Sequence, residues 1–179
     1  MTDKSSIQQI LGCLMKRPQF LSEVDRYSLT IADFSTRFER YIFSAIFGLY
    51  QQGATHLEPV DIANFLEVDT AGKKTFENNN GIEYLQDVMD FSSIENFSYY
   101  YNKLKKINLL RDLKKQGFDT SMFYEEDLTS PTANETNARF EEITVKDICD
   151  GIKKKLIHLE SEYGQNGEIE VESAVTGMR

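Results

Sequence analysis

The chain has 179 residues, 40% of them hydrophobic and 27% charged, which is typical of a folded globular protein and excludes a disordered one. Its net charge of −9 argues against a fragment that grips nucleic acid directly, because neutralised phosphates supply most of the affinity of such proteins. Cys13 and Cys149 suggest neither a disulfide framework nor a metal site, and no apolar run is long enough for a signal peptide or a membrane span. We therefore expect a cytoplasmic protein that has no contact with a membrane.

Apolar residues recur at helical spacing along most of the chain, whereas strand-like alternation is rare. The first predicted helix carries an apolar stripe over residues 7–14 and ends before Pro18, since proline disfavours a helical conformation in the residue that precedes it. The second, over residues 38–50, is apolar on most sides, which predicts a place in the middle of a bundle. Gly53 is placed to end it.

Pro59 marks the start of a short third helix, where its missing N–H costs nothing. Residues 69–81 contain glycines and three consecutive asparagines, and we expect them to form a loop. Helix resumes near Ile82, and a long helix is predicted over residues 94–115.

The polar segment 125–137 is expected to be a loop or hinge. Thr144 and Asp147 have the spacing of a capping box, which predicts a last helix over residues 144–163. Its apolar residues recur at spacings of three and four and form one stripe. The stripe comprises Val145, Ile148, Ile152, Leu156, Leu159 and Tyr163.

The predicted fold is all-α. A compact bundle of about six helices occupies residues 1–105, a protruding helical hairpin follows over 106–163, and residues 164–179 begin a linker. Because two helices alone bury little surface, the apolar stripe of the last helix favours a partner. We expect self-association through an interface that includes Ile148, Ile152, Leu156 and Leu159. The alternative is that this stripe packs on the chain's own bundle.

No group of residues has the spacing of a catalytic or metal site. The Gly-Lys-Lys-Thr segment at 72–75 resembles a phosphate-binding loop, but Lys74 takes the place of the required hydroxyl and Glu67 that of the first glycine. His56 and His158 fit no metal-ligand pattern. We therefore predict no catalytic residue, cofactor or metal in this chain.

Basic side chains concentrate on the long helix and on the last helix. They are Lys103, Lys105, Lys106, Arg111, Lys114 and Lys115 on the former and Lys153, Lys154 and Lys155 on the latter. One interpretation is an electropositive patch for DNA or an acidic partner. We favour a solvated helix face, because lysines keep their ammonium groups in water while their stems cover apolar surface.

Several short motifs follow one another in a specific order. The series begins with Ile10-Leu11-Gly12 and Pro18. It continues with Asp33-Phe34, Ile42-Phe43, Ala45-Ile46, Leu49-Tyr50 and Gly53. It ends with Pro59-Val60-Asp61, the segment 80–85 and the segment 96–100. This series resembles the N-terminal domain of DnaB-type replicative DNA helicases over residues 5–115, with Glu39 or Arg40 in place of the usual histidine. The long segment 69–80 and the weaker match over 120–145 suit a helicase encoded by a phage or plasmid in a bacterial host.

The resemblance implies a division of labour. In that family a helical globule and hairpin form dimers, the dimers assemble into a hexameric collar, and the collar docks primase and, in some systems, a loader. The motor domain, with ATP, Mg and single-stranded DNA, would follow Arg179, so this chain itself is expected not to be an enzyme. Two alternatives stay open: a free-standing adaptor or inhibitor that binds a helicase, and a DNA-binding initiator or loader domain, which the acidic charge disfavours.

Overall fold

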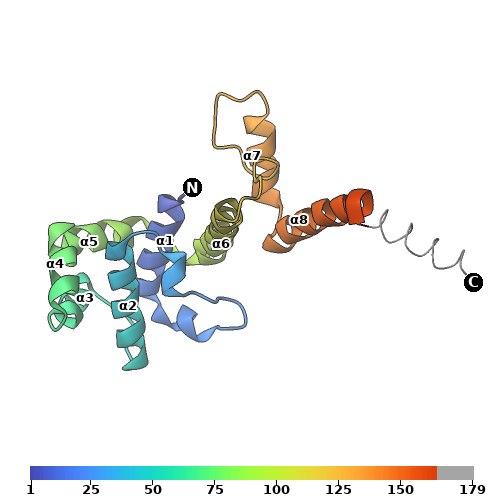
Figure 1. Ribbon diagram of the computed structural model, residues 1–179. Coiled ribbons are helices and arrows are strands. Elements are labelled where there is room, and N and C mark those ends of the chain that lie inside the picture. The colour runs from blue at the N-terminus through green and yellow to red at the C-terminus, as the bar shows by residue number, and fades with distance from the viewer. Residues whose placement is uncertain (165–179) are drawn as a thin grey trace, which may run out of the picture. The chain divides into compact units, whose positions relative to one another are not determined.

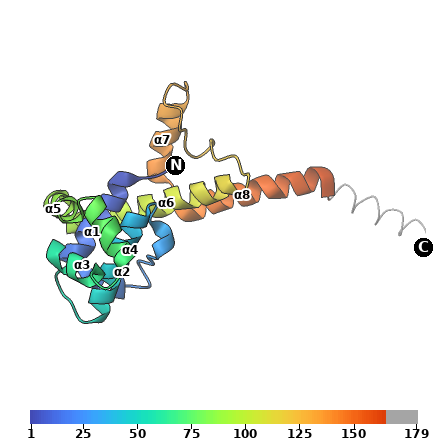
Figure 2. The ribbon, with the colours of Figure 1, turned by 60° about the vertical axis from the view of Figure 1, so that its left-hand side comes forward.

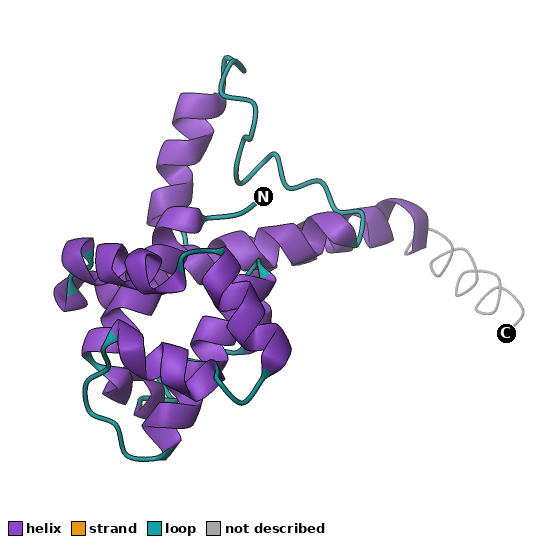
Figure 3. Ribbon diagram, turned by 90° about the vertical axis from the view of Figure 1, so that its left-hand side faces the viewer, coloured by secondary structure: helices purple, strands orange, loops and turns teal. Residues whose placement is uncertain are grey.

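The computed structural model describes residues 1–164, which form helices, turns and loops but no strand (Figure 3). The predicted all-α fold class is therefore confirmed for this part of the chain. Two compact units make up the chain, Met1–Asp119 and a second one that begins at Thr120, whereas the boundary predicted at residue 105 falls within a helix. All of the predicted linker except Gly164 lies outside the described residues.

The first unit is a helical bundle arranged around its first helix (Figure 1). Its helices are α1 (Lys4–Lys16), α2 (Arg37–Gln51), α3 (Pro59–Leu66), α4 (Thr70–Asn78), α5 (Gly81–Phe91) and α6 (Phe97–Lys115), joined by short 3-10 segments at Pro18–Ser22, Ile31–Asp33 and Ile94–Asn96. Helix α1 packs against α5 and α6, while α2 packs against α3 and α4. The core therefore lies between α1 and the helices that surround it.

Helix α1 is buried on nearly all sides of its second half. Its fully buried apolar side chains are Ile7, Ile10, Leu11, Cys13, Leu14 and Met15. Helix α2, for which the sequence predicted the central place, instead buries one face and leaves Phe47 39% exposed. Burial also raises the pKa of the Cys13 thiol to about 11, because the thiolate would lose its hydration.

Gly12 allows α1 to approach α5 closely. A Cβ atom at this position would lie 2.3 Å from the Val88 carbonyl oxygen and 2.4 Å from Ser92 Oγ, so only glycine fits without a shift. Next to this contact, the Lys16 ammonium donates a hydrogen bond to the Ser92 carbonyl at 2.6 Å. The glycine thus fixes the distance between two helices on which the core depends.

A buried carboxylate connects the segment before α2 to α6. Asp33 accepts hydrogen bonds from the Lys105 ammonium at 2.8 and 2.9 Å and from the Asn108 amide at 3.1 Å. It also accepts the Thr30 backbone N–H at 2.8 Å. Because a buried charge is tolerated only when it is paired and hydrogen-bonded, these partners explain why an aspartate can occupy this position.

Residues 69–81 are not the predicted loop. They contain α4, which begins with the Asp69 carboxylate accepting the Gly72 N–H at 3.0 Å and is held to the core by the buried ring of Phe76. The chain then turns through Asn80, whose φ of 51° is left-handed, into α5. With one large apolar side chain, α4 has no visible period, and tertiary packing rather than propensity stabilises it.

The second unit contains α7 (Ala133–Glu142), α8 (Val145–Leu159) and a turn of π-helix at Glu160–Gly164. The loop predicted over 125–137 is therefore wrong from residue 133 onward. The fully buried Phe140 on α7 meets the Tyr124 ring edge-on at 5.1 Å, and the Asn137 amide bonds both backbone groups of Glu125. As in α4, a single aromatic residue positions a helix that is otherwise polar.

We predict that Gly12→Ala destabilises the first unit. Alanine gains about 1 kcal/mol of helix propensity over glycine, but forcing α1 away from α5 costs about 1–3 kcal/mol, and the contact at 2.3 Å places this site at the upper end. Urea unfolding followed by circular dichroism should show a lower midpoint. Ser5→Ala on the exposed side of α1 is the control and should be neutral. A midpoint for Gly12→Ala at or above that of the unmodified chain would refute the close approach.

Candidate assembly interface

A capping box fixes the start of α8, as the sequence predicted. The Asp147 N–H donates to Thr144 Oγ1 at 3.1 Å, while the Asp147 carboxylate accepts the Thr144 N–H at 2.8 Å. The Thr144 N–H, and after it the Thr144 hydroxyl, which donates to the same carboxylate at 2.8 Å, hold the pKa of the Asp147 carboxyl below its usual range. Because the cap fixes the first residue of α8, it also fixes which side of the helix the following apolar side chains occupy.

The apolar stripe of α8 is buried in its first half only. Ile148 is fully buried and Ile152 nearly so, and the helix backbone at Gly151 lies close to the Phe123 ring. Helix α8 continues beyond this part as one unbroken helix (Figure 2). Leu156 and Leu159 in its second half are 50% and 48% exposed, and Tyr163 after it is 78% exposed. The stripe thus continues for two further turns beyond the part that the single chain covers.

One residue of this exposed end lies outside the predicted stripe. Ile157 is 60% exposed and follows Leu156 directly in the sequence, about 100° further around the helix. We use the name α8 end patch for Leu156, Ile157, Leu159 and Tyr163. Ile157 was not predicted because the spacing pattern follows only positions three and four apart. Two consecutive apolar residues, Leu156 and Ile157, in an otherwise polar segment could have indicated it.

Charged side chains occupy most of the remaining positions of α8. Lys146 and Lys153 both approach the Asp150 carboxylate, at 2.6 and 4.0 Å, and the hydrogen bond from Lys146 lowers the pKa of Asp150. His158 lies 3.2 Å from Glu162. Such exposed pairs contribute little to stability, so their main effect is a solvated face beside the α8 end patch.

The basic side chains of α6 are largely used inside the first unit. Lys105 pairs with Asp33, Lys106 is buried, and the Arg111 guanidinium donates to the Ala32 carbonyl at 3.4 Å. Lys115 lies 3.9 Å from Asp112. These contacts favour a structural role for the α6 lysines over a patch that grips DNA.

The remaining candidates do not form chemical sites. The Gly-Lys-Lys-Thr segment lies within α4, and Lys73 forms an ion pair with Glu67 at 2.7 Å. His56 bonds Glu58 at 2.8 Å. Within residues 1–164, no cluster of histidine, cysteine and acidic side chains is placed to hold a metal ion, and no helix is long and apolar enough to span a membrane.

Comparison with known proteins agrees with this arrangement of helices and motifs. The family model of the DnaB-like helicase N-terminal domain matches residues 5–106, which include α1 except its first residue, all of α2–α5 and the first half of α6. The chain belongs to this family. The expectation from its sequence motifs is therefore confirmed, with Gly12 and Asp33 as motif positions whose structural reasons are now clear.

A curated relative shares 33% identity over 167 residues, which is 93% of this chain. It is the SPbeta prophage-derived uncharacterized protein YorI of Bacillus subtilis (strain 168). The chain spans about one third (33%) of that relative's length. Its prophage origin is consistent with the predicted phage encoding, and no solved structure matches the chain.

We predict that acid loosens the start of α8. A carboxyl whose pKa is lower in the folded than in the unfolded chain stabilises the fold above its unfolded pKa, and that stabilisation is lost as the pH falls through the folded value. The helical Cα chemical shifts of residues 145–148 should therefore decline below about pH 4. In Asp147→Asn, which cannot titrate there, these shifts should be reduced already at neutral pH. Identical acid profiles for the two chains would contradict the role of Asp147.

Proposed function

We propose that this chain is the collar-forming scaffold of a hexameric replicative DNA helicase. It holds the motor domains together through self-association and offers primase or a helicase loader a docking surface. The family of its N-terminal domain supports a scaffold role in a helicase. The observation that carries self-association is the α8 end patch, an apolar surface that the single chain leaves uncovered.

The size of this patch sets the expected strength of assembly. Fully burying a leucine side chain stabilises by about 1.5–3 kcal/mol, so hiding the exposed halves of Leu156 and Leu159 contributes about 1 kcal/mol each. A two-fold contact doubles that contribution because both copies supply the same residues. Since association costs about 4–15 kcal/mol, this patch alone gives a weak dimer, and assembly depends on further contacts in the whole protein.

The unwinding activity belongs, in this proposal, to the longer protein. The chain corresponds to about one third (33%) of its curated relative, which leaves ample length for a motor domain. That domain would bind ATP and Mg and contact single-stranded DNA. The acidic net charge of −9 supports this division, because it disfavours direct DNA binding by the collar.

We expect Leu156→Glu to abolish the concentration-dependent rise in mass of this chain. The substitution places a charge in the centre of the α8 end patch, where a partner would have to desolvate it. Light scattering over a concentration series measures the effect. Leu156 is preferred to Ile152 because the buried position of Ile152 would couple assembly to folding.

Ala138→Glu is the matched control, since it adds the same charge at an exposed position of α7, outside the α8 end patch. It should assemble like the unmodified chain. If Leu156→Glu and the unmodified chain rise in mass equally, the α8 end patch is not the seam.

A further inference from the structure

A cavity of about 570 Å³ opens on the first unit where α3, α4 and α5 meet. Its apolar lining comes from Ala63, Phe76 and Ile82, and its acidic lining from Glu67, Glu77 and Glu83. The volume lies within the range of about 300–1,000 Å³ that is usual for binding pockets. Neither the predicted loop nor the family motifs pointed to it, because α4 was not foreseen.

The apolar part of the cavity lining is closely packed. Phe76 is buried, and its ring lies so close to Gly81 that a Cβ there would be 2.3 Å from Cε2. Ile82, on the next position of α5, is 39% exposed and available for contact. An apolar side chain that entered the cavity would therefore meet a fixed aromatic surface and an aliphatic wall.

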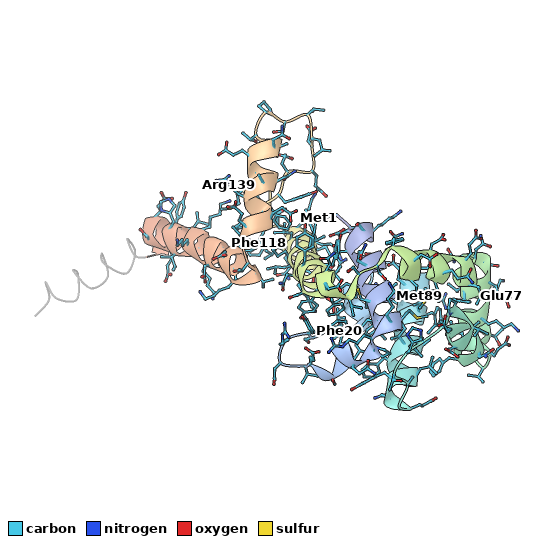
Figure 4. All side chains as sticks on the ribbon, turned by 180° about the vertical axis from the view of Figure 1, so that it is seen from behind. Met1, Phe20, Glu77, Met89, Phe118 and Arg139 are labelled. Carbon is cyan, nitrogen blue, oxygen red and sulfur yellow. The ribbon has the colours of Figure 1, made fainter. Side chains whose placement is uncertain are left out.

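The rim of the cavity carries excess negative charge. Its one lysine, Lys73, bonds Glu67 at 2.7 Å, and this hydrogen bond, with the charges of Glu67 and Glu77, raises the pKa of Lys73. Glu77 and Glu83 form no ion pair among the described residues. Figure 4 places Glu77 on the outer side of the unit.

The surroundings reinforce this charge. Residues 58–91 contain eight carboxylates and two lysines, a net charge of −6 out of −9 for the whole chain. Such a concentration repels phosphate groups and attracts Lys and Arg side chains. The charge therefore selects a cationic partner and disfavours DNA or an anionic lipid surface.

We propose that this cavity docks a helical segment of a partner protein that carries an apolar side chain flanked by Lys or Arg. The apolar side chain contacts Phe76 and Ile82, while the cationic groups pair with Glu77 and Glu83. The inference rests on the proposed function, because it assigns one docking surface to the scaffold. It is independent of the α8 end patch, which lies in the other unit.

The probe is a fluorescein-labelled amphipathic peptide with leucines along one helical face and arginines beside them. A shuffled peptide of the same composition has equal charge but no continuous apolar face. Fluorescence anisotropy should show at least about tenfold tighter binding of the first peptide. Amide chemical shifts of the labelled chain should change at Phe76, Gly81 and Ile82. Equal binding of the two peptides, or shift changes confined to other helices, would overturn the proposal.

Two double variants distinguish binding in the cavity from attraction of the peptide to the acidic surface in general. The double variant Glu77→Gln with Glu83→Gln should weaken peptide binding about tenfold, which corresponds to about 1.4 kcal/mol divided between the two rim charges. Asp87→Asn with Asp90→Asn removes the same charge from exposed positions of α5 that do not line the cavity. Equal weakening by both double variants would overturn the proposal.

A mass measurement keeps this test apart from the test of assembly. By light scattering, the variant with Glu77→Gln and Glu83→Gln should assemble like the unmodified chain. A loss of peptide binding at unchanged mass supports the cavity as a docking site. If the unmodified chain does not self-associate but the peptide still binds the cavity, the collar proposal is contradicted. The docking proposal is then still supported.

Discussion

Close packing of α1 against α5 is the constraint on which the first unit depends. Gly12 brings the two backbones together, and the fully buried side chains on the rest of α1 fill the space that this approach defines. Further contacts attach α6 to the segments between α1 and α2. The Phe20 ring stacks on the Phe97 ring at a centroid distance of 4.0 Å, and the Lys105 ammonium on α6 donates a hydrogen bond to the Asp33 carboxylate. Because α1 is closely packed on most sides, it holds the surrounding helices of the first unit in place.

The second unit follows a different physical logic. Its α8 satisfies half of its apolar stripe through Ile148 and Ile152 and leaves the α8 end patch to water. In a single chain that exposure has a cost, because apolar surface remains hydrated. In the proposed assembly, a second copy would cover this surface, and the two-fold contact would use the same residues of both copies.

Sequence patterns foresaw the elements whose signals are local. The stop before Pro18, the glycine that follows α2 and the box formed by Thr144 and Asp147 all act within a few residues, and the structure confirms them. Helices α4 and α7 were not predicted because a single buried aromatic ring, Phe76 or Phe140, positions each of them through packing within its unit. Their polar residues carry no period from which a helix could be read.

The candidate sites show the same division. Three members of the α8 end patch, Leu156, Leu159 and Tyr163, were predicted from spacing, but which part of the stripe is covered depends on tertiary packing around Ile152. The cavity could not be foreseen at all, since its walls come from three helices, one of them unexpected. The most direct test of the collar is a methyl NMR experiment on a mixture of two differently labelled copies of the chain. The account predicts intermolecular contacts from the methyl groups of Leu156, Ile157 and Leu159; intermolecular contacts found only elsewhere, at concentrations where the mass is dimeric, would contradict it.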